Sequence, residues 1–270
     1  MAAMTMLPQS KRMPALTLTH CLDGDGPPLI LLNGGLMSIA AWDPLIPDLI
    51  QRWCVVRCDF RGQLRTGGPF PRSLDEHAQD VIDLMDLIGI ETAHWLGVSF
   101  GAEVAMVAAA LHGHRVQQLT VITATERTDA RMRRDAAEGR AFAERAAAGG
   151  EGGAELFRQI FAQTWSDQWL ARQPADFLES RIRQVAALPP EFFAGSAAIL
   201  AILDDLDLIP ILGDIAAPTL VIGGADDRMF PPEHSRAIAE LIPGARLEIV
   251  EGTGHGLLFE RADRVIELLA

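Results

Sequence analysis

One serine in this chain stands where its neighbours would make it a nucleophile. Ser99 is the centre of Gly-Val-Ser-Phe-Gly at residues 97–101, after the apolar run 93–96 and before the helix-forming run 102–111. A G-x-S-x-G turn between a buried strand and a helix is typical of a nucleophile elbow. The serine hydroxyl would lie at a helix N-terminus, which favours developing negative charge. The pentapeptide alone could also be an ordinary strand–helix turn.

A serine nucleophile needs a base that takes its proton and an acid that orients the base. In the order Ser…Asp…His, both should follow later strands. Asp226 and Asp227 follow the apolar run 219–222, and His255 lies between glycines after the run 247–250. We expect His255 to be the base. The other histidines are interpreted as satisfied surface or core residues: His20, His77, His94, His112, His114 and His234.

The elements that must position these residues alternate between strands and helices. Apolar or alternating runs predict strands, and a helical spacing predicts a helix over 75–88 that ends at Gly89. The alternation implies an α/β fold, a mostly parallel twisted sheet with helices on both faces. The strands are expected at residues 15–21, 29–32, 55–59, 93–96, 119–122, 219–222 and 247–250, and the last helix at 257–269.

The alternation is interrupted between residues 125 and 213, where no strand is expected. Four helices are predicted instead, separated by glycines at 149–153 and by prolines, and we interpret them as an inserted four-helix lid. The predicted helices are 128–148, 154–172, 175–188 and 191–206. The predicted organisation is a disordered N-terminal arm at 1–14, a core at 15–124 and 214–270, and the lid at 125–213.

Composition narrows the function classes. The 270 residues are 49% hydrophobic and carry a formal net charge of −13, which argues against nucleic acid or an anionic membrane as partner. The three cysteines form no C-x-x-C pair, so neither a zinc site nor a disulfide framework is predicted. The first 14 residues lack the apolar stretch of a signal peptide, and no apolar run is long enough to span a membrane. We expect a cytoplasmic protein.

Several motifs together resemble the α/β-hydrolases of the esterase and lactonase type, from about Ala15 to the C-terminus. They are Leu31-Leu32-Asn33-Gly34-Gly35 with Trp42, Asp59-Phe60-Arg61-Gly62, the Ser99 pentapeptide, Gly224 to Pro231 in the pattern G-x-x-D-x-x-x-P, and Gly254-His255. In that pattern the acid precedes proline by four residues. The resemblance therefore implies Asp227 rather than Asp226.

The resemblance also implies an oxyanion hole of two backbone N–H groups. One belongs to Phe100, and the other to Gly35, or to Leu36 if the loop is shifted by one residue. The chain departs from the family at Asn33, where many relatives have histidine, and at residues 59–66, where the usual D-x-R-G-x-G-x-S has lost its second glycine and its serine. It also has Ala102 as the second small residue after Ser99, and Gly256 after His255. Carbon–carbon bond hydrolases often have tryptophan at this last position. Relatives that cleave carbon–halogen bonds or epoxides carry an aspartate nucleophile, which Ser99 argues against.

Two residues of the insertion could contact a substrate. Arg131, one of six arginines between residues 127 and 145, could hold a carboxylate, although a solvated face of alternating charges is the favoured interpretation. Trp165 could line a pocket, although its helical spacing with Trp169 favours core packing.

The expected function is hydrolysis of a small carboxylic ester or lactone through an acyl-enzyme, with no metal or organic cofactor. Acyl transfer, perhydrolysis and carbon–carbon bond hydrolysis are alternatives within the same fold. A slow-turnover ligand sensor is an alternative of another class. The expected partner is a small-molecule ester or lactone, and the oligomeric state stays open.

Overall fold

The computed structural model describes residues 18–269. Its centre is a seven-stranded sheet in the order β1-β3-β2-β4-β5-β6-β7, in which β1 is antiparallel to β3 and every other neighbouring pair is parallel. This confirms the predicted mostly parallel α/β sheet. The strands are β1 (His20–Asp23), β2 (Pro28–Leu32), β3 (Cys54–Cys58), β4 (Ala93–Val98), β5 (Val116–Ile122), β6 (Thr219–Gly224) and β7 (Arg246–Val250).

Two predictions concern the N-terminal residues, of which the structure describes only those from 18 onward. The expected arm at 1–14 lies outside the described residues, and so does the first part of the strand expected at 15–21. The observed edge strand β1 begins later, at His20, and runs to Asp23.

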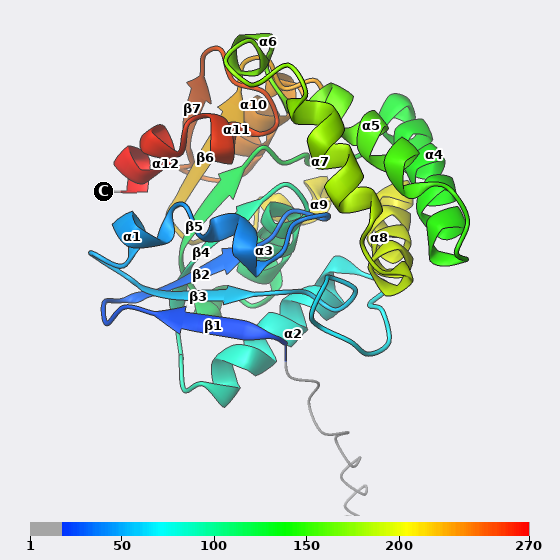
Figure 1. The fold of residues 1–270 in the computed structure, drawn as a ribbon. Helices are drawn as coiled ribbons and strands as arrows, with labels where there is room; N and C mark the ends of the chain where they lie inside the picture. Colours follow the sequence, from blue (N-terminus) through cyan, green and yellow to red (C-terminus); the bar gives the residue numbers. More distant parts are fainter. Residues whose placement is uncertain (1–17, 270) are drawn as a thin grey trace, which may run out of the picture.

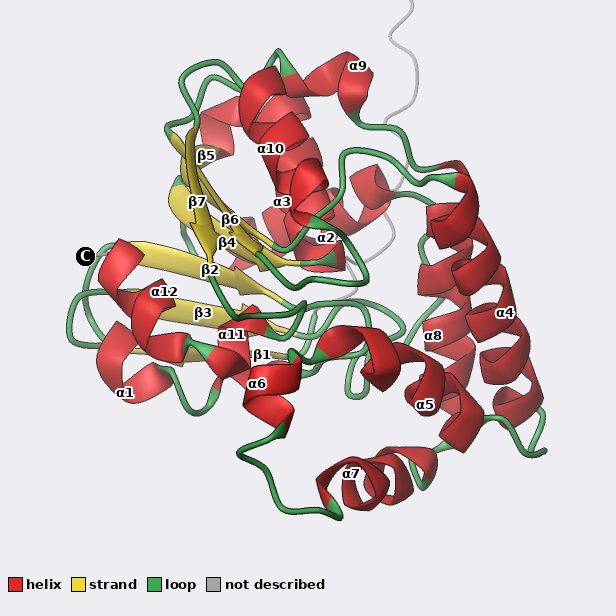
Figure 2. Ribbon diagram, turned by 90° about the horizontal axis from the view of Figure 1, so that it is seen from above, coloured by secondary structure: helices red, strands yellow, loops and turns green. Residues whose placement is uncertain are grey.

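The central strands β2 and β4 are mainly apolar because helices cover both faces of the sheet. Every residue of β4 is buried. Helices α2 (Leu74–Leu87), α3 (Phe100–Leu111) and α10 (Pro232–Leu241) cover one face, and the short helix α1 (Ile46–Leu49) with α11 (Leu257–Glu260) and α12 (Ala262–Leu269) covers the other (Figures 1 and 2). Short 3-10 helices lie at Ile39–Trp42 and Gly113–Arg115.

Helix α2 follows its sequence signals closely. The Ser73 side chain accepts a hydrogen bond from the Glu76 N–H, 3.2 Å away, and so caps the N-terminus. Gly89 has φ +77°, a left-handed conformation that suits glycine just beyond a helix end. The buried face of α2 includes Val81, Leu84 and Met85.

His77 on the same helix differs from the expectation for the non-catalytic histidines. It is buried against the rings of Phe60 and Phe100, and neither ring nitrogen has a hydrogen-bond partner among the described residues. Burial lowers the pKa of His77 to about 3, so the ring is neutral at physiological pH. It packs as an aromatic ring rather than as a satisfied polar group.

The segment between β5 and β6 is helical, and it lies beyond the carboxyl ends of the strands (Figure 2). Its own apolar cluster includes Leu156, Phe157, Phe192 and Phe193. The segment comprises α4 (Ala130–Ala147), α5 (Gly153–Thr164), α6 (Asp167–Leu170), α7 (Phe177–Ala186), α8 (Pro190–Ile202), a 3-10 turn at Leu203–Asp205 and α9 (Ile209–Leu212).

The two ends of this insertion run side by side. The Thr128 N–H donates to the Leu206 carbonyl at 3.0 Å, and the Leu208 N–H donates to the Glu126 carbonyl at 2.7 Å. A β-bridge joins Arg127 to Asp207 between them. The sequence predicted no strand pairing here, because an isolated bridge leaves no periodic pattern.

The helix predicted over 154–172 is wrong as a single element. It ends at Thr164, Trp165 is extended (φ −103°, ψ 141°), and α6 starts afresh with Ser166 as its cap. The cause is tertiary, because the Ser166 N–H and hydroxyl both donate to the buried Glu260 carboxylate. The helix expected at 257–269 is likewise interrupted, at Arg261.

Within residues 18–269 no single helix has both the length and the apolar character needed to cross a membrane. One pair, Phe177–Ala186 with Pro190–Asp205, reaches that length and apolarity together but is bent by 103°.

Candidate active site

Ser99 occupies a strained turn between β4 and α3. Its φ of +51° and ψ of −124° are unfavourable for an L-residue, and the surroundings must therefore hold it there. The turn is too tight for side chains on either flank. A Cβ on Gly97 would lie 2.2 Å from the Gly101 carbonyl oxygen, and a Cβ on Gly101 would lie 2.4 Å from that of Leu32. The two glycines are thus what allows the hydroxyl-bearing turn to form.

His255 and Asp227 are brought together from the loops after β7 and β6. The His255 Nδ1 lies 2.9 Å from Asp227 Oδ2, and the Asp227 side chain is fully buried. Its other oxygen accepts hydrogen bonds from the Met229 and Phe230 N–H groups, each at 2.9 Å. The carboxylate is therefore held in one orientation. Asp226, the alternative acid in the sequence, is exposed.

A cavity of about 270 Å³ lies between the Ser99 turn and the His255 loop. Ser99 and His255 both line it, as do Phe100, Gly35 and Leu36. Within residues 18–269 no acceptor is bonded to the backbone N–H of Phe100, Gly35 or Leu36. The cavity thus holds a hydroxyl, an imidazole and unused N–H donors, the groups that acyl transfer through a serine requires.

The loop that carries Gly35 is braced from below by Asn33. Its amide nitrogen donates to the Cys58 carbonyl at 2.9 Å and to the Gln63 side-chain oxygen at 2.9 Å, and its oxygen accepts from the Trp42 indole at 2.7 Å. Gln63 in turn donates to the Gly34 carbonyl at 2.8 Å. Asn33 therefore positions the loop through a buried network. The sequence showed that Asn33 stands where many relatives have histidine, but it did not show which groups hydrogen-bond to Asn33.

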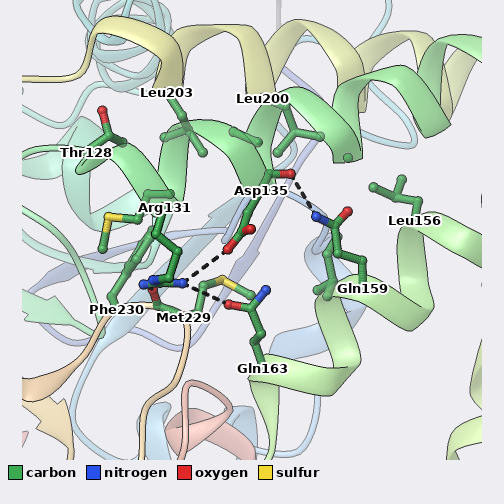
Figure 3. Close-up of a pocket in the computed structure, with 14 residues that line it drawn as sticks. Thr128, Arg131, Asp135, Leu156, Gln159, Gln163, Leu200, Leu203, Met229 and Phe230 are labelled. Carbon is green, nitrogen blue, oxygen red and sulfur yellow. Dashed lines mark hydrogen bonds and ion pairs between the residues drawn. The ribbon is translucent and has the colours of Figure 1, made fainter.

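Arg131, which the sequence offered as a possible substrate ligand, does not line the Ser99 cavity. It lines a smaller neighbouring pocket of about 70 Å³ rather than the Ser99 cavity (Figure 3). Its guanidinium donates to the Gln163 side-chain oxygen (3.1 Å) and to the Met229 carbonyl (2.8 Å), and pairs with Asp135. It connects α4 and α5 to the loop of Asp227.

Trp165 does line the Ser99 cavity, although it is not on a helix. Its ring covers Gly256, since a Cβ there would lie 2.6 Å from the indole. It also stacks on Trp169, with centroids 4.4 Å apart. Nearby, the Gly256 N–H donates to the Thr164 carbonyl at 2.7 Å, so the His255 loop is bonded directly to the insertion.

Glu103 is a cavity residue that the sequence analysis missed. It lies one helical turn after Ser99, is 0% exposed, and lines the same cavity. Burial raises the pKa of its carboxyl to about 8, against a smaller opposing effect of the Thr125 backbone N–H. The available signal was a lone acid in the otherwise apolar run 102–111.

Within the described residues, no cluster of three or more His, Cys, Asp or Glu side chains could hold a metal ion.

Comparison with known proteins agrees with this geometry. Residues 27–262 match the family model described as the alpha/beta hydrolase fold. A relative from Caulobacter segnis named "Putative carbamate hydrolase RutD" is 30% identical over 240 residues, covering 86% of this chain and 85% of that protein. The enol-lactonase structure from Burkholderia xenovorans LB400 is 26% identical with a TM-score of 0.81, covering 93% of this chain and 94% of that one.

The fold alone is shared with MGS-M2, an alpha/beta hydrolase enzyme from a Medee basin deep-sea metagenome library. That structure has a TM-score of 0.86 at 20% identity and covers 93% of this chain and 92% of its own. The matched residues contain the Ser99 turn and both loops of the His255–Asp227 pair. This chain belongs to the α/β-hydrolase fold family.

Proposed function

We propose that the protein is a serine hydrolase that cleaves a small carboxylic ester or lactone through an acyl-enzyme. The observation that carries the proposal is the shared cavity. It brings the strained Ser99 turn and the Asp227-bound His255 imidazole to one apolar space of about 270 Å³. The enol-lactonase likeness supports an ester-type carbonyl as the target.

In the proposed reaction, the Ser99 hydroxyl oxygen attacks the substrate carbonyl carbon while His255 Nε2 takes the hydroxyl proton. Asp227 accepts the Nδ1–H bond and stabilises the imidazolium. The N–H groups of Phe100 and Gly35, or of Leu36 in place of Gly35, bind the negative oxygen, and each such donor is typically worth about 10²–10³ in rate.

Collapse of this intermediate re-forms the carbonyl and breaks the bond between the carbonyl carbon and the alkoxide oxygen, and the leaving alkoxide takes the proton from His255. A water molecule then attacks the acyl-enzyme carbonyl and gives one proton to His255. His255 returns this proton to the Ser99 oxygen as the carboxylic acid leaves. The helical insertion roofs the cavity through α5 and Trp165, which is the role of a lid that excludes bulk water.

A carbamate is the second candidate substrate, because the 30% identical relative carries that activity in its name. Serine attack on a carbamate carbonyl uses the same groups, but this carbonyl bears both a nitrogen and an oxygen substituent, and either the alcohol or the amine leaves. Acyl transfer, perhydrolysis and carbon–carbon bond hydrolysis would also use the same triad. The products distinguish them.

The test is intact-protein mass after treatment with a fluorophosphonate, on wild type and Ser99→Ala. We expect one adduct on the wild type and none on the variant, followed by turnover of an ester, lactone and carbamate panel by the wild type. Competing alcohol and peroxide in the same assay would reveal transfer or perhydrolysis. An adduct that persists on Ser99→Ala would overturn the assignment. A labelled wild type that turns over no panel member and instead gains stability with a ligand would favour the sensor.

A further inference from the structure

Glu103 is a buried acid inside the Ser99 cavity that the proposed reaction does not use. Its backbone N–H donates to the Ser99 carbonyl at 3.1 Å, so Glu103 lies in the first turn of α3, directly after Ser99. Both residues line the same cavity. Helical side chains also lean toward the N-terminus, which directs Glu103 toward Ser99.

The carboxyl of Glu103 lacks a well-aligned hydrogen bond. Its side chain is 0% exposed, and within the described residues neither oxygen has a partner of good hydrogen-bond geometry, although the Thr125 backbone N–H is near enough to oppose the rise in its pKa. Buried polar groups in native proteins are nearly always hydrogen-bonded, so an exception that lines a cavity points to a missing ligand group. Burial favours the protonated acid, and no neighbouring charge contributes to its shifted pKa.

The rest of the cavity sharpens this inference. Its lining is mostly apolar, and the Thr164 hydroxyl is already bonded to the Ile160 carbonyl at 2.8 Å. The Trp165 indole N–H is buried without a partner, on the insertion side of the cavity. The residues that line the cavity therefore include one buried carboxyl that can donate and accept, and one buried N–H donor.

We propose that Glu103 is a specificity-determining residue that hydrogen-bonds an uncharged polar group, such as a hydroxyl, carbonyl or amide, on the acyl part of the substrate. The group would lie near the scissile carbonyl, because Ser99 and Glu103 line one cavity. A second carboxylate would be disfavoured, because it would be buried in an apolar cavity without a cation. The proposal rests on the proposed function.

The experiment compares two matched esters, p-nitrophenyl 3-hydroxybutyrate and p-nitrophenyl butyrate. The full-length wild type, Glu103→Gln, Glu103→Met and the control Glu240→Gln are assayed for kcat/KM on both, since Glu240 is exposed on α10. We expect wild type and Glu240→Gln to favour the hydroxy ester. Glu103→Gln keeps the preference, because an amide can still donate and accept. Glu103→Met lowers the ratio of the two kcat/KM values about tenfold, the effect of one lost hydrogen bond to substrate.

A structural role for Glu103 predicts a different pattern. Glu103→Met would then lower Tm and reduce both kcat/KM values together. Our proposal expects an unchanged or higher Tm, because removal of a buried carboxyl that lacks a well-aligned hydrogen bond relieves its burial cost. An unchanged ester ratio in Glu103→Met, or a wild type without preference, would overturn the proposal.

Fluorophosphonate labelling separates this outcome from failure of the proposed function. A wild type labelled at Ser99 whose ester ratio ignores Glu103 would refute only the role of Glu103. An unlabelled Ser99 would refute both.

Discussion

At the scale of single residues, the geometry of the site depends on side chains and turns whose own surroundings fix their conformation. Asp227 is oriented by two backbone N–H groups before it meets His255, so its position does not depend on the imidazole. Ser99 is held in a positive-φ conformation that a free chain would avoid. Such over-determined residues keep their geometry when one partner is changed.

Asp227→Asn should therefore leave the fold intact and remove most activity. The amide cannot stabilise an imidazolium and favours the wrong histidine tautomer, a change that costs about 10⁴ in kcat in a comparable triad. Steady-state kinetics on a nitrophenyl ester would measure it. Asp226→Asn is the matched control and should stay close to wild type, because Asp226 is exposed. Equal losses in both variants would contradict the assignment of the acid.

Glu103 also predicts how stability depends on pH. Its pKa rises from a usual 4.5 to about 8 on folding. Between these values the folded chain keeps a proton that the unfolded chain releases, so the free energy of unfolding should fall as pH rises from 5 to 8. The slope is at most about 1.4 kcal/mol per pH unit.

Urea unfolding of wild type and Glu103→Gln over that pH range measures this effect. Glu103→Gln should lack the contribution, whereas His77, whose pKa is lowered to about 3, affects both proteins alike. Parallel stability curves for the two proteins would contradict the raised pKa of Glu103.

At the scale of elements, the site depends on how closely β4, α3 and the loop after β2 approach. Gly97 and Gly101 are the points of contact, with backbone carbonyls 2.2 Å and 2.4 Å from where a Cβ would lie. Backbone cannot yield as a flexible side chain can. The approach of strand to helix is what places Ser99 beside the Gly35 loop.

Gly97→Ala should destabilise the protein by at least about 2 kcal/mol, because overpacking against backbone forces the strand and helix apart. Chemical denaturation measures the free energy of unfolding. Gly113→Ala is the control, since nothing lies within 4 Å of its Cβ position, and should change stability by no more than about 0.5 kcal/mol. If both alanine variants were equally stable, the tight turn would not be what holds Ser99.

At the scale of the whole molecule, the site forms where two parts of the chain meet. The sheet supplies Ser99, Asp227 and His255 from its carboxyl edge, and the helical insertion supplies the opposite wall. Among the bonds that join them are Arg131 to the Met229 carbonyl and the Gly256 N–H to the Thr164 carbonyl. Both end on loops that carry a member of the proposed triad, so the seating of the insertion and the geometry of the triad are coupled.

Arg131→Met should loosen this coupling. The variant loses the bond to the Met229 carbonyl, whose own N–H donates to Asp227. We expect kcat/KM to fall by about threefold to tenfold and stability by about 1–2 kcal/mol, the worth of a charged hydrogen bond at a half-exposed site. Arg134→Met, which changes an exposed arginine on the same helix, should do neither. Identical kinetics in both variants would show that Arg131 is not a link between insertion and acid loop.

The sequence by itself determined the features that depend on neighbouring residues. Strand and helix identity followed from periodicity, the end of α2 from Gly89, and the Ser99 turn from its flanking glycines. Its motifs also nominated Asp227, which the structure places against His255.

Only the tertiary structure decided what long-range contacts determine. The His255–Asp227 bond spans 28 residues, Arg131 reaches Met229 across 98, and Ser166 reaches Glu260 across 94. The last of these breaks the helix expected at 154–172, and the second takes Arg131 away from the Ser99 cavity. The burial of Glu103 likewise depends on the elements around α3 rather than on its neighbours in sequence. Local patterns report which residues share a face within a few turns, but which faces meet is set by packing of the whole chain.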